Sequence, residues 1–405
     1  MPEIKIAARS SPLSRAQVKE IESLMPEITF VKHYIKTTGD LDRSTSLREM
    51  EKTDFFTREL DQWLLDKKCD ICIHSAKDLP DPLPKGLAIF ALTKGVDSSD
   101  SLVFKKTLPD RPLIATSSIR REEQTRQLFP SARFIDLRGT IEERLALLEK
   151  SEVDGVVVAE AALIRLNLSH YKRLKLPGET TPYQGQLAIL GRKGESSLKS
   201  IFSKLDIRKK ALSIGLTKPE ETLEKNIFHY PMIQIIPQAG AHLHSSAPFL
   251  LFTSKVAVDL FFDQATPCPD TKILAIGSAT AKRVEERGGK VSRIAKESTL
   301  EGMISLLKEI PPKERHCFWP HSALSRDVLK EFFEKEGGTL SECILYDTKV
   351  YPPPENLNIK EFDEVIFTSS SCVDSFVHFF GTLPTSVKWS AIGPVTEKKC
   401  MAMLR

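Results

Sequence analysis

Lys77 and Asp78 are the residues of the N-terminal half whose types and position best suit chemistry. They stand in His-Ser-Ala-Lys-Asp-Leu-Pro at 74–80, directly after the apolar run 69–74. Open α/β sheets bind ligands where parallel strands end, and a carboxylate there can stabilise a developing cation and assist proton movement. The alternative is that Asp78 caps a helix or a turn. These residues alone leave both interpretations open.

A group of arginines in the same half suits the binding of anions, because a guanidinium fork binds a carboxylate through two parallel hydrogen bonds. The group consists of Arg9, Arg120, Arg121, Arg138, Arg144 and Arg165. Ser117 and Ser118 precede a predicted helix, where hydroxyls and backbone N–H groups meet the positive end of the helix dipole. We therefore predict an anionic substrate.

The seven cysteines are scattered and odd in number, so no disulfide framework is expected. Cys69 and Cys72 have the spacing of a metal-binding pair, but both fall in the predicted buried strand 69–74. Residues three apart in a strand point to opposite faces. The pair is therefore predicted to be core cysteines, and no metal site is expected.

The composition excludes several classes of protein. A length of 405 residues predicts more than one domain. The net charge of +4 is too small and too mixed with acidic residues for a nucleic-acid surface. No run of 18 apolar residues predicts a membrane span, and residues 1–8 lack the pattern of a signal or transit peptide. A cytoplasmic location is expected.

Strand-like and amphipathic segments alternate along the whole chain, which predicts an α/β fold. In the first half the predicted strands are 4–8, 28–35, 69–74, 113–115, 133–136 and 155–159, and the predicted helices are 14–24, 55–66, 120–128, 141–150 and 187–192. A second block begins near Leu212, with predicted strands at 249–253, 273–276, 316–319, 343–346, 364–367 and 388–392.

Six ordered segments make the first half resemble porphobilinogen deaminases. They are 8–13 (Ala-Arg-Ser-Ser-Pro-Leu), 37–40 (Thr-Thr-Gly-Asp), 74–78, 116–121 (Thr-Ser-Ser-Ile-Arg-Arg), 137–140 (Leu-Arg-Gly-Thr) with Arg144, and 184–185 (Gln-Gly). The resemblance implies deamination of porphobilinogen to a methylene-pyrrole cation, which the next pyrrole attacks. It makes Asp78 the catalytic aspartate and gives Lys77, Ser11, Ser117, Ser118 and the arginines of these segments to the substrate carboxylates. Arg165 lies outside the six segments and matches the family only loosely, so a solvated surface position is its alternative.

The first half also departs from this family. Deaminases hold a dipyrromethane primer on a cysteine of a third domain, and that domain and its attachment cysteine are missing here. Cys72 is a poor anchor because of its strand setting. In the loop over the active site, Glu-Lys-Thr-Asp-Phe-Phe at 51–56 replaces Gly-Gly-Lys-Gly-Leu-Phe. The primer is then held without a covalent bond or by a partner that supplies the missing domain, or else this half binds precursors without polymerising them.

The second half resembles uroporphyrinogen III synthase through a weaker ordered series of segments. They are 215–220, 231–237, 252–258, 275–280, 345–348, 367–371 and 391–396. The resemblance implies metal-free ring closure of hydroxymethylbilane, with Tyr346 transferring a proton or positioning water. The alternative for Tyr346 is packing at the hinge. Thr280, Ser371 and Thr396 are further predicted site residues, each with helix capping as its alternative.

This half differs from its family near residue 405. The chain ends one helix after Gly393 and Pro394, where the family has a further strand and helix. We therefore expect the first synthase-like lobe to be smaller than in the family by that strand and helix.

These patterns predict a fused α/β protein of tetrapyrrole biosynthesis. Two lobes like those of periplasmic binding proteins, residues 1–92 with 184–210 and residues 93–183, precede two synthase-like lobes, residues 211–240 with 352–405 and residues 241–351. The leading function is polymerisation of porphobilinogen followed by closure to uroporphyrinogen III. One rival retains only the synthase activity. The other is a non-enzymatic anion-binding or regulatory protein, for which Asp78→Ala leaves function intact.

Overall fold

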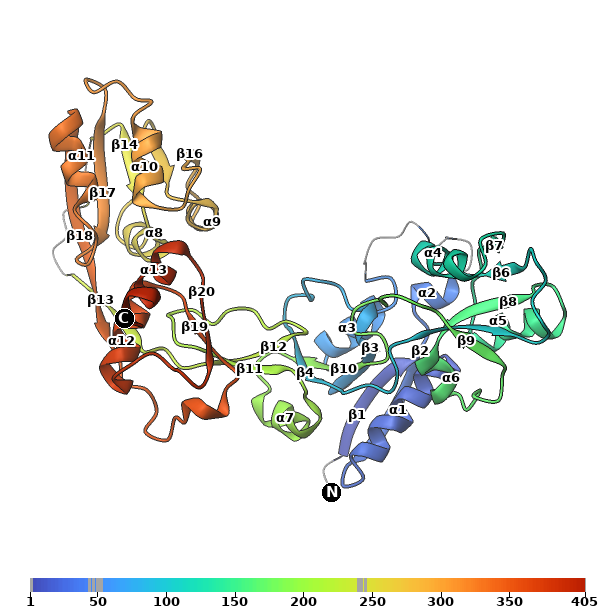
Figure 1. The fold of residues 1–405 in the computed structure, drawn as a ribbon. Coiled ribbons are helices and arrows are strands. Elements are labelled where there is room, and N and C mark those ends of the chain that lie inside the picture. The colour runs from blue at the N-terminus through green and yellow to red at the C-terminus, as the bar shows by residue number, and fades with distance from the viewer. Residues whose placement is uncertain are drawn as a thin grey trace. The chain divides into compact units, whose positions relative to one another are not determined.

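A computed structural model describes residues 3–404 except 43–44, 46–47, 49–53, 239–242 and 244–245. The chain forms two compact units. Unit 1 comprises Met1–Lys209 and Glu221–Asn226, and unit 2 comprises Lys210–Glu220 and Ile227–Arg405. Both units are built of helices and strands, and in places several strands follow one another directly (Figure 1). The predicted α/β class is confirmed.

The first sheet of unit 1 has the order β2-β1-β3-β10-β4. Its strands are β1 (Glu3–Arg9), β2 (Thr29–Ile35), β3 (Ile71–Ser75), β4 (Leu87–Leu92) and β10 (Leu187–Arg192). The helices and turns around it are α1 (Pro12–Leu24), α2 (Thr38–Leu41), α3 (Arg58–Leu65), η1 (Ala76–Asp78), α7 (Ser196–Ile201) and η2 (Ser203–Leu205). Strand β1 runs parallel to β2 and β3, so the segments after β1 and β3 leave the same edge of the sheet.

The prediction of a helix at 187–192 was wrong, because these residues form β10. The strand runs antiparallel between β3 and β4, and its first five residues are buried. A short apolar run covered on both faces has the same pattern in a buried strand as in a buried helix. The peptide N–H of Ala76 donates to the carbonyl of Gln186 at 3.0 Å, so the residues before β10 also fix the start of η1.

The second sheet of unit 1 has the order β7-β6-β8-β5-β9. Its strands are β5 (Asp100–Phe104), β6 (Leu113–Ala115), β7 (Arg133–Ile135), β8 (Gly155–Ala159) and β9 (Arg173–Lys175). Its helices are α4 (Ile119–Leu128), α5 (Ile141–Glu149) and α6 (Glu160–Arg165). Because β6 is parallel to both β7 and β8, the starts of α4, α5 and α6 lie along one edge.

The chain passes twice between the two sheets of unit 1, and the two passages touch. The peptide N–H of Thr93 donates to the carbonyl of Leu187 at 2.9 Å. Gly185 has a φ of +83°, and a Cβ on it would collide with the backbone of Asp97. Glycine is therefore required at this position of the Gln184-Gly185 segment.

Unit 2 also contains two sheets, with the orders β12-β11-β19-β20 and β13-β18-β17-β14-β15-β16. The strands are β11 (Lys209–Ser213), β12 (Lys225–His229), β13 (Ile233–Pro237), β14 (Phe249–Phe252), β15 (Lys272–Ala275), β16 (Val291–Ile294), β17 (His316–Ser322), β18 (Thr339–Val350), β19 (Glu364–Phe367) and β20 (Lys388–Ala391). The helices are α8 (Lys255–Phe262), α9 (Ser278–Glu286), α10 (Leu300–Leu307), α11 (Val328–Glu336), η3 (Ile359–Glu361), α12 (Ser370–Phe380) and α13 (Pro394–Met403).

The limits of the four predicted lobes stay a prediction. Residues 233–237 lie in the segment predicted for the first synthase-like lobe, yet as β13 they pair with β18 of the six-stranded sheet.

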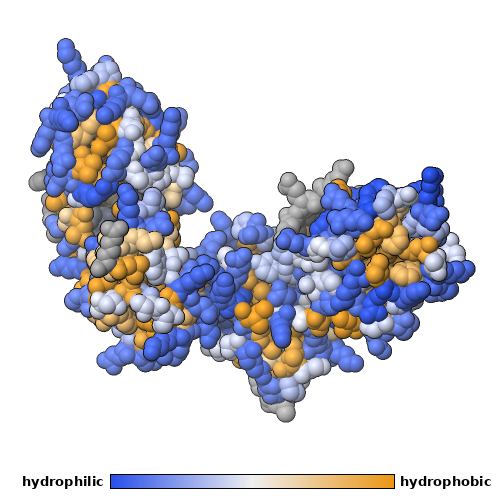
Figure 2. Space-filling view, in the orientation of Figure 1, coloured by the Kyte–Doolittle hydropathy of each residue, from blue (hydrophilic) through white to orange (hydrophobic). Residues whose placement is uncertain are grey.

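The surface of both units mixes hydrophilic areas with smaller apolar ones (Figure 2). Apolar atoms make up much of any folded protein's surface, so single exposed apolar side chains are ordinary. Across the part of the chain that the structure describes, no helix has the length and apolar character needed to cross a bilayer.

Residues 221–226 belong to unit 1 through a buried network of charges. Arg208 is 5% exposed and binds both oxygens of Asp206, at 2.9 Å each. Glu221 accepts hydrogen bonds from Lys199 at 2.8 Å and from Arg208 at 3.4 Å. Removing one partner from such a network leaves a buried charge poorly compensated.

We expect Glu221→Ala to destabilise unit 1 by about 1–3 kcal/mol, which lowers its melting temperature by several degrees. Calorimetry of the full chain measures this change. Glu220→Ala is the matched control, because Glu220 is exposed and lies in unit 2. An equal effect of the two substitutions would show that the Glu221 contacts contribute nothing to stability.

Candidate functional site

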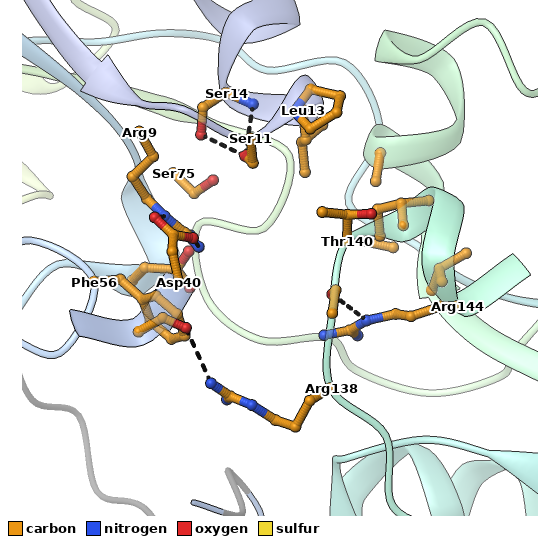
Figure 3. A pocket seen from close by; sticks show the side chains of 18 of the residues that line it. Arg9, Ser11, Leu13, Ser14, Asp40, Phe56, Ser75, Arg138, Thr140 and Arg144 are labelled. Atoms are coloured by element: carbon orange, nitrogen blue, oxygen red, sulfur yellow. Dashed lines mark hydrogen bonds and ion pairs between the residues drawn. The ribbon is translucent and has the colours of Figure 1, made fainter. Parts of the chain in front are cut away.

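A cavity of about 480 Å³ lies between the two sheets of unit 1. The loops after β1 and β3 and helix α2 line it from the first sheet, and the loops after β6, β7 and β8 line it from the second. Figure 3 shows side chains from both groups pointing into the same space. The charged residues at its wall are Arg9, Asp40, Lys77, Asp78, Arg121, Arg138, Glu142 and Arg144. The edge of each sheet at which its parallel strands end thus contributes to one site.

Three helices begin at this cavity. Ser11 caps α1 by accepting a hydrogen bond from the Ser14 peptide N–H at 3.2 Å, and Pro12 occupies the first helical turn. Thr140 caps α5 in the same way through the Glu143 peptide N–H, and α4 begins after Ser118. The N-terminal end of a helix carries partial positive charge and unpaired N–H groups. All three ends favour an anion in the cavity.

The described wall of the cavity carries more cationic than acidic side chains. Arg9 is paired with Asp40, which also accepts from the Thr37 peptide N–H at 3.0 Å. Burial, with the nearby charges of Arg121 and Arg138, lowers the pKa of Arg144 to about 10. Burial likewise lowers the pKa of Arg138. Both guanidiniums remain charged at neutral pH, so a bound anion would relieve their mutual repulsion.

Two buried guanidinium donors are unused. Nε of Arg121 and Nη1 of Arg138 have no hydrogen-bond acceptor among the described residues. The other terminal nitrogen of Arg138 donates to the carbonyls of Gly39 at 3.1 Å and Asp42 at 2.7 Å. A buried donor without a partner costs free energy. Their position in the cavity indicates that a ligand supplies the missing acceptors.

Asp78 ends the short turn η1 and lines the cavity. It is half-buried, and within the described ranges no hydrogen bond reaches its carboxylate. Asp78 thus lies in a turn, and both its role in the reaction and its role as a turn residue stay predictions. Lys77 is also half-buried and donates to Oε1 of Gln184 at 3.3 Å. Burial lowers the pKa of Lys77, against the opposing effect of Asp78.

Asp100 and Gln184 form a second layer behind the cavity, in which Gln184 belongs to a segment that the sequence singled out and Asp100 does not. Asp100 is 1% exposed and accepts from Arg120 at 2.7 Å, from Arg121 at 2.6 Å and from Nε2 of Gln184 at 2.9 Å. Gln184 in turn accepts from Lys77 and Arg121 at 3.3 Å each. Despite burial, the two arginines keep the pKa of Asp100 below its ordinary value. This carboxylate orients Arg121 toward the cavity.

The structure brings nine of the predicted site residues of unit 1 to the cavity wall. They are Arg9, Ser11, Lys77, Asp78, Ser117, Ser118, Arg121, Arg138 and Arg144. Arg120 and Arg165 are not at the wall. Arg120 binds Asp100 and Gln124, and Arg165 binds both oxygens of Glu20 at 2.6 and 3.1 Å. Their role in substrate binding stays a prediction.

The altered loop lies partly outside the described residues, because 51–53 are not described. Phe56 lies at the cavity wall, and the Arg9 guanidinium stands 4.4 Å from the centre of its ring. Phe55 and Phe56 both pack onto Gly39, where a Cβ would collide with the Phe56 ring. The loop thus contributes an aromatic surface next to a cation.

The structure corrects the argument that Cys69 and Cys72 point to opposite faces of one strand. Cys69 precedes β3, so the alternation of a strand does not separate the two side chains. Their sulfurs lie 3.7 Å apart, and both residues are fully buried. Among the described residues there is no group of three potential metal ligands.

His74 and Asp61 form a buried pair beneath the cavity. Their closest atoms, Nε2 and Oδ1, are 3.7 Å apart, and the side chains are 3% and 5% exposed. Burial lowers the pKa of His74 to about 3, so the ring is neutral at neutral pH. Burial raises the pKa of Asp61 to about 6. His74 is therefore a buried, neutral histidine that does not line the cavity.

Asp61→Asn should stabilise the protein at pH 7.5 by about 2–3 kcal/mol and have little effect near pH 3.5. The folded state raises the pKa of Asp61 above its ordinary 3.8, so its contribution to stability is lost as the pH rises toward 6. Denaturant unfolding at the two pH values measures the difference. Asp66→Asn is the control, because Asp66 ends the same helix in an exposed position. Destabilisation by Asp61→Asn at pH 7.5 would contradict the assigned charge state.

The predicted site residues of unit 2 fall into two groups. Tyr346 on β18 and Thr280 on α9 belong to the six-stranded sheet and its helices, while Ser371 on α12 and Thr396 on α13 belong with the four-stranded sheet. Tyr346 is 5% exposed within the core, which raises its pKa, and its hydroxyl lies 2.9 Å from Oγ of Ser254.

The other three residues of unit 2 lie in the first turns of their helices. They do not cap them, because the caps are Gly277, Ser369 and Gly393. Thr280 and Thr396 are buried, and Ser371 is half-buried. Their roles stay predictions.

Known families match both halves of the chain. The family described as "Porphobilinogen deaminase, dipyromethane cofactor binding domain" matches residues 4–200, and "Uroporphyrinogen-III synthase HemD" matches residues 220–403. A probable porphobilinogen deaminase of Chlamydia pneumoniae is 37% identical over 209 residues, covering 49% of this chain and 88% of that protein.

Two further similarities concern one half each. A porphobilinogen deaminase of Nostoc sp. is 34% identical over 218 residues, covering 50% of this chain and 68% of that protein. A solved mutant uroporphyrinogen III synthase of Thermus thermophilus is 17% identical, with a TM-score of 0.36 over 48% of this chain and 89% of that one.

Proposed function

The chain belongs to the porphobilinogen deaminase family through its N-terminal half and carries a uroporphyrinogen-III synthase domain in its C-terminal half, and from this we propose that one chain converts porphobilinogen to uroporphyrinogen III. Unit 1 would join porphobilinogen into hydroxymethylbilane. Unit 2 would close that linear product. Both halves come from enzyme families of tetrapyrrole biosynthesis, which favours this proposal over a non-enzymatic role.

The observation that carries the first half of the proposal is a cavity wall that combines Asp78 with several cations, two of which have an unused donor. Porphobilinogen brings an acetate and a propionate on each ring, and Arg121, Arg138 and Arg144 offer donors to such groups. The starts of α1, α4 and α5 add backbone N–H groups. A ligand with several carboxylates around a small ring fits this arrangement.

We assign Asp78 to the reacting pyrrole. Deamination breaks the bond between the aminomethyl carbon and its nitrogen, and the electron pair leaves with ammonia. The pyrrole nitrogen then shares the positive charge, and a carboxylate that accepts its N–H hydrogen bond stabilises that charge. The open carbon of the next pyrrole attacks the methylene group and loses a proton, whose movement Asp78 would assist.

The family binds a dipyrromethane cofactor, which supplies the first acceptor pyrrole when it is bound. The cations of the cavity fit its carboxylates, but no cysteine lines the cavity. We propose that the attachment cysteine is absent from this chain. The sequence supports this, because Cys69 and Cys72 are its only cysteines before Cys268.

A second candidate function is favoured by that missing cysteine. In this alternative the front half binds pyrrole carboxylates without extending them, and only unit 2 is a catalyst. The two candidates differ in what the chain does with porphobilinogen alone.

The test supplies the two substrates separately to the purified full chain. We expect ammonia release from porphobilinogen and, in a second reaction, closure of added hydroxymethylbilane to the type III isomer. Closure without ammonia release would reject the deaminase half and leave the second candidate. Ammonia release without closure would reject the synthase half.

For unit 2 we propose that the Tyr346 hydroxyl transfers a proton or positions water during ring closure. Tyr346→Phe removes only this hydroxyl, so closure should slow by about 10²-fold while the melting temperature changes little. Closure of added hydroxymethylbilane measures the rate, and Tyr351→Phe is the control because Tyr351 is exposed. A lower melting temperature with an unchanged rate would assign Tyr346 to packing instead.

We also propose a cytoplasmic location and small-molecule partners, porphobilinogen and hydroxymethylbilane. Six buried thiols suit a reducing compartment. A separate protein that supplies the missing deaminase domain is the remaining partner to test.

A further inference from the structure

The cysteines of unit 1 cannot serve as an anchor for a pyrrole chain. Cys69 and Cys72 are the only two before Cys268 in the sequence. Both are fully buried, and Sγ of Cys72 also lies 3.3 Å from the Leu60 carbonyl oxygen. Burial raises the pKa of the Cys72 thiol, which disfavours the thiolate that would attack a methylene-pyrrole cation. Neither residue lines the cavity.

Several hydroxyls at the cavity wall are also engaged. Ser11 Oγ holds the start of α1 and lies 3.1 Å from Ser14 Oγ. Ser117 Oγ donates to the Leu137 carbonyl, and Thr140 Oγ1 accepts the Glu143 peptide N–H. Lys77 supplies an amine at the cavity wall, which is intrinsically a better nucleophile than a hydroxyl. A bond from it to a methylene-pyrrole would be an aminomethyl-pyrrole, the same linkage that porphobilinogen deamination breaks.

The cavity nevertheless offers several groups that can bind an anion without a covalent bond. Arg121 and Arg138 present unused donors, Arg144 is crowded by like charges, and three helices begin at the wall. Its volume of about 480 Å³ falls within the range of sites for small organic ligands, about 300–1,000 Å³. A short oligopyrrole with two carboxylates per ring matches both the charge and the size.

We propose that unit 1 holds its oligopyrrole primer by ion pairs and helix N-termini alone, with no covalent bond to the chain. The inference rests on the proposed function, because it concerns the ligand of the same cavity. A primer held in this way exchanges with solution, so it is lost when the protein unfolds and weakens as ionic strength rises.

The test measures the mass of the full chain twice after incubation with porphobilinogen and removal of small molecules. We expect the native protein to carry the added mass of two or more pyrrole units and the acid-denatured protein to carry none. Arg144→Gln should lower the native occupancy about tenfold or more. Cys69→Ser with Cys72→Ser, and separately Cys268→Ser, should leave it unchanged, with circular dichroism as the check on folding.

Added mass that persists on the denatured chain would overturn the inference, and peptide mapping would then show whether Lys77 or Cys268 carries it. A chain that binds no pyrrole in either state but still forms tetrapyrrole would overturn the inference and leave the proposed function standing. A chain with neither bound pyrrole nor product would overturn both.

Discussion

Asp78→Asn is expected to slow the consumption of porphobilinogen by about 10²–10⁴-fold while leaving its binding nearly unchanged. Asparagine keeps the shape of the side chain but removes the charge that would stabilise the methylene-pyrrole cation. In the proposed function the carboxylates of the substrate would be held elsewhere, by Arg121, Arg138 and Arg144, which line the same cavity. The rate should therefore fall without a matching loss of affinity.

Colorimetric loss of porphobilinogen measures the rate, and calorimetric titration measures the affinity. Asp81→Asn is the matched control, because Asp81 is exposed and lies only three residues from Asp78. An Asp78→Asn protein that consumes porphobilinogen at the rate of the Asp81→Asn protein would remove Asp78 from the reaction.

Arg144→Gln should weaken the binding of pyrrole carboxylates by about 10–100-fold, the loss expected when one partner of a charged contact in a closed site is removed. The same substitution should maintain or raise the melting temperature of the ligand-free protein. Burial and neighbouring cations lower the pKa of Arg144, so the charged guanidinium opposes folding when no anion is bound. Loss of affinity together with retained stability distinguishes a ligand-binding arginine from a structural one.

Calorimetric titration and differential scanning calorimetry provide the two measurements. Arg126→Gln is the control, because Arg126 is exposed on α4 and stacks on the Phe134 ring 4.6 Å away. Unchanged affinity in the Arg144→Gln protein, or a loss of stability without a loss of affinity, would contradict the proposed role.

The sequence predicted those site residues whose positions follow from strand ends. Asp78 and Ser118 come shortly after strands or at a helix start, and parallel pairing gathers such positions at one edge. Such positions can be recognised from the residues immediately around them. The local pattern also carries capping residues, so that Ser11 and Pro12 together mark the start of α1.

Contacts between distant segments could not be predicted in this way. Arg120 and Arg121 are neighbours with similar sequence surroundings, yet only Arg121 reaches the cavity. Which of the two arginines reaches the cavity depends on Asp100, which lies twenty residues before Arg120 and binds both side chains. No pattern around Asp100 indicates that a fully buried carboxylate orients two arginines.

The most direct test of the central claim is the isomer of uroporphyrin that the purified chain makes from porphobilinogen as the only protein present. Oxidation of the product and chromatographic separation of the isomers provide the measurement. If unit 1 polymerises porphobilinogen and unit 2 closes the product, the type III isomer will predominate. The type I isomer alone, which forms when hydroxymethylbilane closes without a synthase, or no porphyrin at all, would contradict the account.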